Sequence, residues 1–251
     1  MLNNPGEYKR MFEAESELWW YKALHTFVLE SIQKEFKNKD IKIIDAGCGT
    51  GGLITFLNQY SFKNISGFDI SPHALKYCRS KGSNVFEGNL QNIASYFEEG
   101  SIDVVISNDN LYFLTEYERL NVLQGMNSVL RTGGLLVLNL PAFNAFRGTH
   151  DLGVGIKKRF IKKDMRNLLN LSEMSIVKLM YWPFILSPLI FAIRTFQRIK
   201  IRLFKIKKAD SDVEIPPLWL NKLFYKVTLF ENRFKGNVPW GSSLFAVLKK
   251  K

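Results

Sequence analysis

A cluster of glycines at residues 45–52, with the sequence DAGCGTGG, is the part of this chain best suited to binding a ligand. Glycine lets the backbone turn tightly and approach a ligand without a Cβ clash. The helical pattern that follows would add free backbone amides and the positive end of a helix dipole. Gly47, Gly49 and Gly51 give the pattern G-x-G-x-G, whereas Gly47, Gly49 and Gly52 also fit the dinucleotide pattern G-x-G-x-x-G. The stretch therefore predicts a cofactor loop and leaves the cofactor open.

Two carboxylates flank this loop. Asp69 closes the next predicted strand about 20 residues on, where a carboxylate can accept hydrogen bonds from both hydroxyls of a ribose. That arrangement serves a dinucleotide or another ribose-bearing cofactor equally well. The feature that separates these alternatives is the acidic Asp45, two residues before the first glycine, together with the later strands.

Strands and helices alternate on both sides of the loop. Short β-rich runs are predicted at 41–46, 64–69, 83–87, 102–107 and 134–140, and helices start at 53 and span 72–80 and 117–130. This alternation predicts βαβ units and a parallel sheet, and so an α/β fold. Further along, a helix at 161–170 and strands at 174–181 and 242–248 are predicted, and residues 8–36 are predicted to form one helix.

The chain closely resembles class I S-adenosylmethionine-dependent methyltransferases of the bacterial small-molecule type. The resemblance covers residues 40–145 and rests on five blocks in order: IIDAGCGTG (43–51), GFDIS (67–71), EGNL (87–90), IDVVISNDNLYF (102–113) and VLRTGGLLVLNLPA (129–142). It implies a Rossmann-like seven-stranded sheet, mostly parallel with the last strand antiparallel and with helices on both faces. It also implies S-adenosyl-L-methionine as cofactor and S-adenosyl-L-homocysteine as product.

The resemblance assigns the cofactor site residue by residue. The loop would hold the methionine end, Asp69 the ribose, and Ile70 would pack on the adenine. Position 89 often carries Asp in the family, and Asn89 can still accept from the adenine amino group and donate to a ring nitrogen. The full predicted set is Asp45, Gly47, Cys48, Gly49, Gly51, Asp69, Ile70, Asn89, Leu90 and Asn108.

Methyl transfer is a displacement at an activated donor, so the enzyme mainly aligns the acceptor and excludes water. Relatives often carry Glu-His after the fourth strand, where this chain has Tyr112 and Phe113, so we expect pocket-lining side chains and no base there. A His150-Asp151 pair beyond the fifth strand matches a subset of these enzymes. It predicts His150 as candidate base and Asp151 as its orienting group, against the alternative that His150 only orders its loop.

The same subset resemblance suggests further acceptor-pocket residues. An aromatic-rich, basic stretch around His150 contributes Phe143 and Arg159, and the N-terminal helix contributes Trp19 and Trp20. Two tryptophans on a helix are also typical of core packing. No Cys or His spacing indicates a metal site.

Charge is unevenly distributed. Residues 152–251 carry 21 Lys and Arg against 6 Asp and Glu, whereas residues 1–151 carry 14 against 17, for a net charge of +12 overall.

The uncharged stretch 179–193 is too short to cross a membrane. The stretch 194–208 predicts a basic helix with one apolar face, formed by Phe196, Ile199, Leu203 and Ile206. It would serve either as a lid packed on the sheet edge or as a contact with an anionic membrane surface.

These patterns predict three parts: an N-terminal helical cap at 1–38, a cofactor-binding domain at 39–182 and 242–251, and a basic helical insertion at 183–241. The start MLNNPGEYKR carries no secretory signal, which predicts a cytoplasmic protein, with peripheral contact at the inner face of the membrane as an option. The oligomeric state is left open.

The favoured function is methylation of a partly apolar small molecule, such as a lipid, quinone, glycan precursor or secondary metabolite. A nucleic-acid methyltransferase would also explain the basic half, but SNDNLYF (107–113) lacks the Asn/Asp-Pro-Pro-aromatic block that acts on base amino groups. A nicotinamide dehydrogenase, or a cofactor-binding descendant of the fold that no longer methylates, would also fit the glycine loop.

Overall fold

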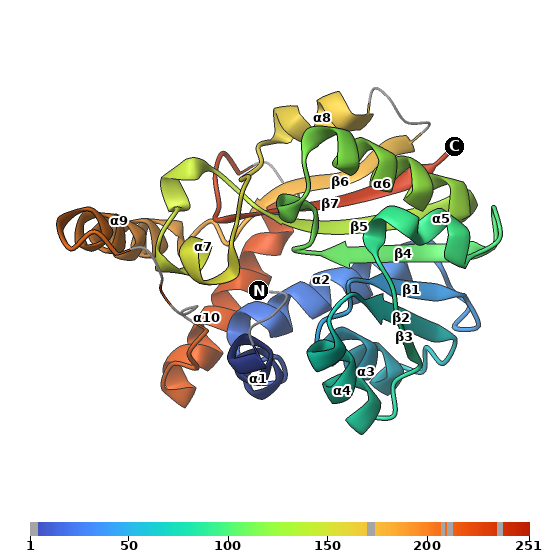
Figure 1. The fold of residues 1–251 in the computed structure, drawn as a ribbon, viewed down its shortest axis with the longest axis horizontal. Helices are drawn as coiled ribbons and strands as arrows, with labels where there is room; N and C mark the ends of the chain where they lie inside the picture. Colours follow the sequence, from blue (N-terminus) through green and yellow to red (C-terminus); the bar gives the residue numbers. More distant parts are fainter. Residues whose placement is uncertain (1–4, 170–173, 207–208, 210–212, 235–237) are drawn as a thin grey trace.

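The structure is a computed structural model, and it describes residues 5–169, 174–206, 209, 213–234 and 238–251. A seven-stranded sheet lies at its centre (Figure 1) in the order β3-β2-β1-β4-β5-β7-β6. The strands are β1 (Ile43–Ala46), β2 (Ile65–Asp69), β3 (Val85–Glu87), β4 (Ile102–Asn108), β5 (Leu130–Pro141), β6 (Met174–Trp182) and β7 (Ser243–Lys250).

The first five strands pair in parallel, and β7 pairs antiparallel with both β5 and β6. The predicted Rossmann-like α/β sheet with an antiparallel last strand is therefore confirmed. β1 lies between β2 and β4, so the chain order reverses at this strand. In open parallel sheets a crevice forms at the carboxyl ends of the strands at such a reversal, and ligands bind there.

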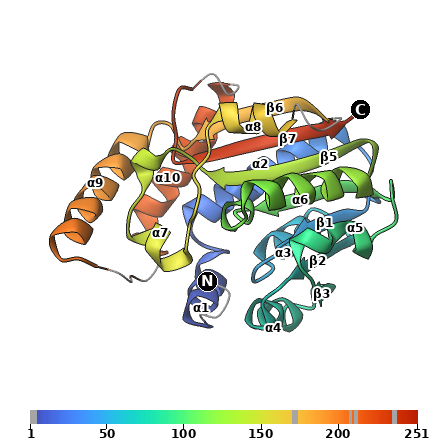
Figure 2. The same cartoon turned by 45° about the horizontal axis from the view of Figure 1, so that its top comes forward.

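Helices cover both faces of the sheet (Figure 2). On one face lie α2 (Trp19–Glu35), α3 (Gly52–Gln59), α4 (Pro72–Ser80) and α10 (Leu218–Glu231). Their apolar side chains share a core cluster with β1, represented by Phe27, Leu53 and Leu75. On the other face lie α5 (Ile93–Tyr96), α6 (Glu116–Val129) and α8 (Lys162–Leu169), and Val122 and Met165 belong to a second cluster there.

The single N-terminal helix predicted at 8–36 is wrong. The segment forms α1 (Pro5–Ala14) and α2, joined by a turn. Glu15 in that turn is buried against the glycine loop, whereas α2 packs on the sheet. No glycine or proline marks the break at residues 15–18, so a helical pattern runs through it unbroken.

The basic helix of the insertion begins earlier than predicted. α9 spans Ser187–Leu203, and residues 207–208 of the predicted stretch lie outside the described residues. The uncharged segment 179–193 is split, because its first residues finish β6 and its last ones start α9. Within the described ranges, no helix is long and apolar enough to cross a membrane.

Candidate active site

A cavity of about 960 Å³ opens at the carboxyl ends of the strands around β1. Its lining comes from the glycine loop, the ends of β2 and β4, α1, the start of α2, α7 (Thr149–Val154) and α9. A volume near the upper end of the usual range for ligand pockets can accommodate two molecules side by side. All but three of the residues predicted for the site line it, the exceptions being Gly51, Phe143 and Asp151.

Gly47 must be glycine for two reasons. Its φ angle is +80°, and a Cβ there would lie 2.4 Å from Nδ2 of Asn110. Asn110 fills this space because its Nδ2 atom donates to the carbonyl oxygens of Ala46 at 3.1 Å and Gly47 at 3.2 Å. A residue that the sequence analysis did not select, two positions after Asn108, therefore fixes the first turn of the loop.

Asp69 binds the same loop from the end of β2. Its Oδ2 atom accepts from the amide of Gly49 at 3.0 Å, and its Oδ1 atom accepts from the amide of Ser71 at 2.9 Å. Burial raises the pKa of this carboxyl above its usual value. Each carboxylate oxygen can accept a second hydrogen bond, so Asp69 can still bind hydroxyl groups in the cavity.

Other predicted cofactor residues surround the same space. Ile70 is 42% exposed and lines the cavity, an arrangement suited to stacking on a planar ring. The Oδ1 atom of Asn89 accepts from the amide of Gln91 at 3.0 Å. The Oδ1 atom of Asn108 is buried and has no hydrogen-bond partner among the described residues. Gly51 instead packs on Cys78, since a Cβ on it would lie 3.0 Å from the Cys78 Sγ atom.

The loop end of the cavity is acidic. Asp45, Asp69, Glu7 and Glu15 all line it. Burial, with Asp69 and Glu15 nearby, raises the pKa of Asp45 to about 7. Glu7 pairs with Arg10 and Glu15 pairs with Lys81, whereas Asp45 and Asp69 repel each other, and a bound cation would relieve that repulsion. A cationic organic ligand with a diol and a planar ring therefore matches the charges and shape of this end.

Helix α1 closes this end of the cavity; it lies in the predicted N-terminal cap, but none of its residues was predicted for the site. Tyr8, Met11 and Glu15 line the cavity, and the Phe12 ring stacks on Tyr77 of α4 with 4.6 Å between ring centroids. Burial and the Asp69 charge raise the pKa of Tyr8 to about 12. Only a helical pattern is visible in the sequence here, and such a pattern carries no sign of the strand ends it will cover.

The opposite end of the cavity is aromatic. Trp19, Trp20, Tyr112 and Phe113 line it, as predicted, and so does Phe146. Trp20 is held by stacking on Trp182, with 5.3 Å between ring centroids. Phe143 was also predicted for the acceptor pocket, but it is not among the residues that line the cavity, and its ring packs on Tyr181 with 4.6 Å between ring centroids.

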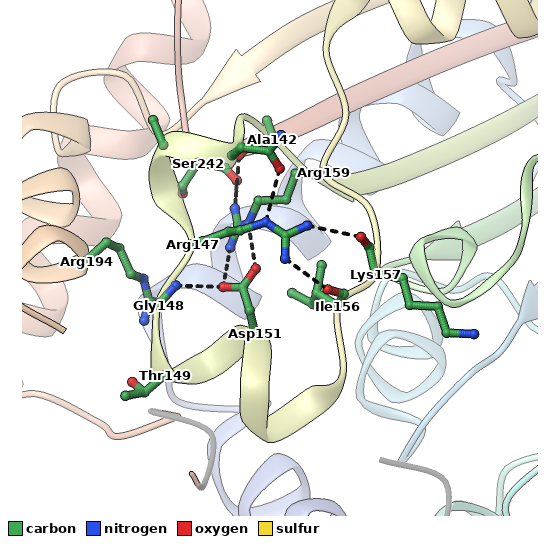
Figure 3. Close-up of polar contacts among 12 residues, drawn as sticks. Ala142, Arg147, Gly148, Thr149, Asp151, Ile156, Lys157, Arg159, Arg194 and Ser242 are labelled. Atoms are coloured by element: carbon green, nitrogen blue, oxygen red, sulfur yellow. Dashed lines mark hydrogen bonds and ion pairs between the residues drawn. The ribbon is translucent and has the colours of Figure 1, made fainter. Parts of the chain in front are cut away.

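The segment 142–160, which contains α7 and His150, is held together by a buried ion pair (Figure 3). Arg159 donates from Nε and Nη2 to the two oxygens of Asp151 at 2.8 and 2.9 Å, and Nη1 donates to the carbonyl of Ala142 at 2.9 Å. Asp151 also accepts from the amide of Gly148 at 3.0 Å. Both partners are almost fully buried. These bonds give Asp151 a role in holding Arg159 and the start of α7, and its predicted role of orienting His150 stays a prediction.

A different carboxylate interacts with His150. Asp109, directly after β4, lines the cavity together with His150. Its Oδ2 atom accepts from Nδ2 of Asn139 at 2.8 Å, and the Oδ1 atom of Asn139 accepts from Trp182 at 2.9 Å. Burial raises the pKa of Asp109 to about 7, while Asn139 and the charges of His150 and Arg159 lower it.

The backbone at Asp109 supports its assignment to the site. Its φ angle is +54°, in the left-handed region that non-glycine residues seldom adopt. Such strained positions cluster at functional sites. The sequence signal available was an acid between two asparagines in SNDN (107–110).

Within the described residues, no group of three or more His, Cys, Asp and Glu side chains is placed to hold a metal ion. Cys48 and Cys78 are free thiols whose Sγ atoms lie 3.8 Å apart.

Comparison of the sequence with known proteins gives independent evidence about the family of this chain. A family model described as a methyltransferase domain matches residues 37–180, which is more than half of the chain. The ubiquinone/menaquinone biosynthesis C-methyltransferase UbiE of Campylobacter jejuni subsp. jejuni is 30% identical over 117 residues, covering 43% of this chain and 48% of that protein. The chain thus matches about half the length of this curated relative.

Solved structures share the fold at low identity. A possible histamine N-methyltransferase from Thermotoga maritima is similar at a TM-score of 0.59 and 15% identity, over 98% of this chain and 96% of that one. The geranyl diphosphate C-methyltransferase of Streptomyces coelicolor A3(2) is similar at a TM-score of 0.55 and 12% identity, over 91% and 78%.

Proposed function

The chain belongs to the methyltransferase domain family, and on this basis we propose that it transfers a methyl group from S-adenosylmethionine to a partly apolar small molecule. Membership confirms the class I resemblance inferred from the five sequence blocks. The observation that carries the proposal is the cavity, which has an acidic end at the glycine loop and an aromatic end beside His150.

The residues at the acidic end fit the cofactor. S-Adenosylmethionine supplies a methyl group already activated on a cationic sulfonium. Asp69 would accept hydrogen bonds from the ribose hydroxyls, and the exposed face of Ile70 would pack on the adenine. The carboxylates of Asp45 and Asp69 favour the positive charge, and the buried Oδ1 atom of Asn108 offers one further acceptor.

The aromatic end supports a partly apolar acceptor. Aromatic walls contribute apolar contact area with few polar groups to satisfy. One relative is named for ubiquinone and menaquinone biosynthesis, and one solved structure for geranyl diphosphate. Both names describe molecules with a large apolar part, so a quinone precursor or another prenyl-bearing compound is the acceptor class we favour.

We assign proton removal from the acceptor to His150, with Asp109 as its charge partner. Both side chains line the cavity, and their charges interact. Asn139 holds the Asp109 carboxylate in place from the neighbouring strand. An ionised Asp109 would stabilise the imidazolium formed when His150 takes a proton.

Cofactor binding can be tested separately from transfer. Calorimetric titration with S-adenosylhomocysteine should show tight binding by the wild type and loss of binding in Asp69→Ala. Glu99→Ala, which removes an exposed acid that does not line the cavity, is the control and should bind like the wild type. Unchanged affinity in a folded Asp69→Ala variant would refute the cofactor assignment.

The acceptor class can be tested with methyl-labelled S-adenosylmethionine and a bacterial extract split into lipids and nucleic acids. We expect label in the organic phase. Label in nucleic acid would support the rival methyltransferase class, and cofactor binding with no labelled product would support a descendant that does not methylate.

His150→Gln should keep cofactor affinity and lower transfer by roughly 100-fold or more.

A further inference from the structure

Helix α9 has its polar side turned toward the protein. Thr149 donates its amide to Gln197 at 3.3 Å, and Arg194 donates to the same Gln197 oxygen at 2.9 Å. Arg198 donates to the carbonyl of Ala145. The bond between Arg194 and Gln197 lies within α9, whereas the contacts with Thr149 and Ala145 fix α9 against α7, which carries His150, and the residues just before it. This is the end of the molecule where α9 projects beyond the strands (Figures 1 and 2).

The apolar side of α9 is turned outward. Phe196, Ile199 and Leu203 follow one another at helical spacing and are 69%, 52% and 70% exposed. Phe204, just past the end of the helix, is also exposed. A helix that only covers a protein core would bury this face and expose its polar one. The predicted lid, with its apolar face packed on the sheet edge, is therefore not the arrangement observed.

Positive charge surrounds this exposed face. Residues 187–208 contain seven Lys and Arg and no Asp or Glu, and Lys200, Arg202 and Lys205 on the described part are exposed. Apolar patches with a basic border are typical of helices that lie in the interface of an anionic bilayer. A twofold contact between two copies through α9 would bring the like charges of both helices together, which costs free energy.

We propose that the outward face of α9 docks this protein on the surface of an anionic lipid bilayer. Ile190 and Arg194, on the inner side of the same helix, line the cavity. One helix therefore separates the docking face from the acceptor end of the cavity. Docking would bring that end of the cavity to the lipid surface, where a partly apolar molecule resides. The docking itself does not depend on methyl transfer.

Vesicle sedimentation with the full chain tests this. The wild type should sediment with vesicles of phosphatidylcholine mixed with phosphatidylglycerol, bind pure phosphatidylcholine weakly, and detach as salt rises. Phe196→Glu combined with Leu203→Glu should reduce binding at least about tenfold, because two apolar anchors are lost and the new charges repel anionic lipid. Lys200→Glu combined with Arg202→Glu should have a similar effect through charge alone.

Tyr117→Glu is the matched control, since Tyr117 is a similarly exposed apolar residue on α6. It should bind vesicles like the wild type. All variants should retain the wild-type circular dichroism and affinity for S-adenosylhomocysteine. Vesicle binding that is unchanged in both folded α9 variants, or is equal on neutral and anionic lipid, would overturn the proposal. So would a stable dimer of the wild type that Phe196→Glu makes monomeric and that does not bind vesicles.

Discussion

Glu15 accepts a hydrogen bond from the amide of Gly52, the first residue of α3, at 3.0 Å. The same Oε2 atom accepts from the hydroxyl of Thr50 at 2.7 Å, and Lys81 pairs with the other oxygen. A carboxylate at a helix N-terminus is favoured by the free amides and the helix dipole. This relationship ties the N-terminal segment that covers the cavity to the loop that forms its floor.

Replacing Glu15 should loosen that cover. In Glu15→Ala we expect the affinity for S-adenosylhomocysteine to fall by roughly tenfold, because hydrogen bonds to a charged group contribute about 1.5–3 kcal/mol. Amide exchange in α1 should also speed up. Glu13→Ala, which removes an exposed carboxylate on the same helix, should change neither quantity. Equal affinity and equal exchange in Glu15→Ala would contradict the role of this contact.

The fit between Gly47 and Asn110 makes a second prediction. Gly47→Ala should abolish S-adenosylhomocysteine binding, because its Cβ would collide with the Asn110 side chain at a left-handed φ angle. Asn110→Ala in the same chain should restore part of the affinity by freeing the space. Calorimetry on both variants checks this, and no recovery in the double variant would show that backbone strain alone accounts for the loss.

The buried pair of Asp151 and Arg159 should affect stability more than chemistry. Asp151→Asn leaves the Arg159 charge buried without its partner, which typically costs about 3–5 kcal/mol. For a chain of this size, that corresponds to a fall in Tm on the order of 6–20 °C. Thermal unfolding measures this directly. His150→Gln should leave Tm nearly unchanged, and the opposite ranking of the two variants would be evidence against the division of roles.

Because the pKa of the buried Asp109 is raised, we expect the stability of the protein to depend on pH. Burial raises its pKa in the folded protein to about 7, against about 3.9 in an unfolded chain. Between these values the folded state binds more protons, so the contribution of Asp109 to stability falls as pH rises from about 4 to about 7. Asp109→Asn removes this dependence while keeping a group that can contact Asn139.

We therefore expect Asp109→Asn to unfold at a higher temperature than the wild type at about pH 8 and at a similar temperature near pH 4. Its methyl transfer should be lower above about pH 7, where Asp109 of the wild type is ionised and would act as the charge partner of His150. A Tm difference that is the same at both pH values would show that Asp109 does not titrate in this range.

Most of the sheet could be predicted from the sequence, because a strand followed by a glycine turn and a helix is a local pattern. The ends of β1, β2 and β4 carry the predicted residues Asp45, Asp69 and Asn108, and parallel topology alone brings those ends to one edge. The need for glycine in the loop was also visible locally, since Gly47 and Gly49 both adopt positive φ angles, whereas its contacts with Asn110 and Asp69 come from distant segments.

The partners of the charged groups were decided only by tertiary structure. His150 and Asp151 are adjacent in sequence, yet the Asp151 carboxylate is bound to Arg159, and the carboxyl whose pKa is lowered by the His150 charge is that of Asp109, directly after β4. Glu15 accepts a hydrogen bond from Gly52, which lies 37 residues away in the sequence. The hydrophobic pattern predicted the apolar face of α9 up to Leu203, although the helix ends there, before the predicted Ile206. Whether that face turns inward depends on what the polar side contacts. The local sequence pattern determines which helix faces are apolar and where loops form. The packing of segments that are distant in sequence determines which charged side chains pair and which helix faces stay exposed to water.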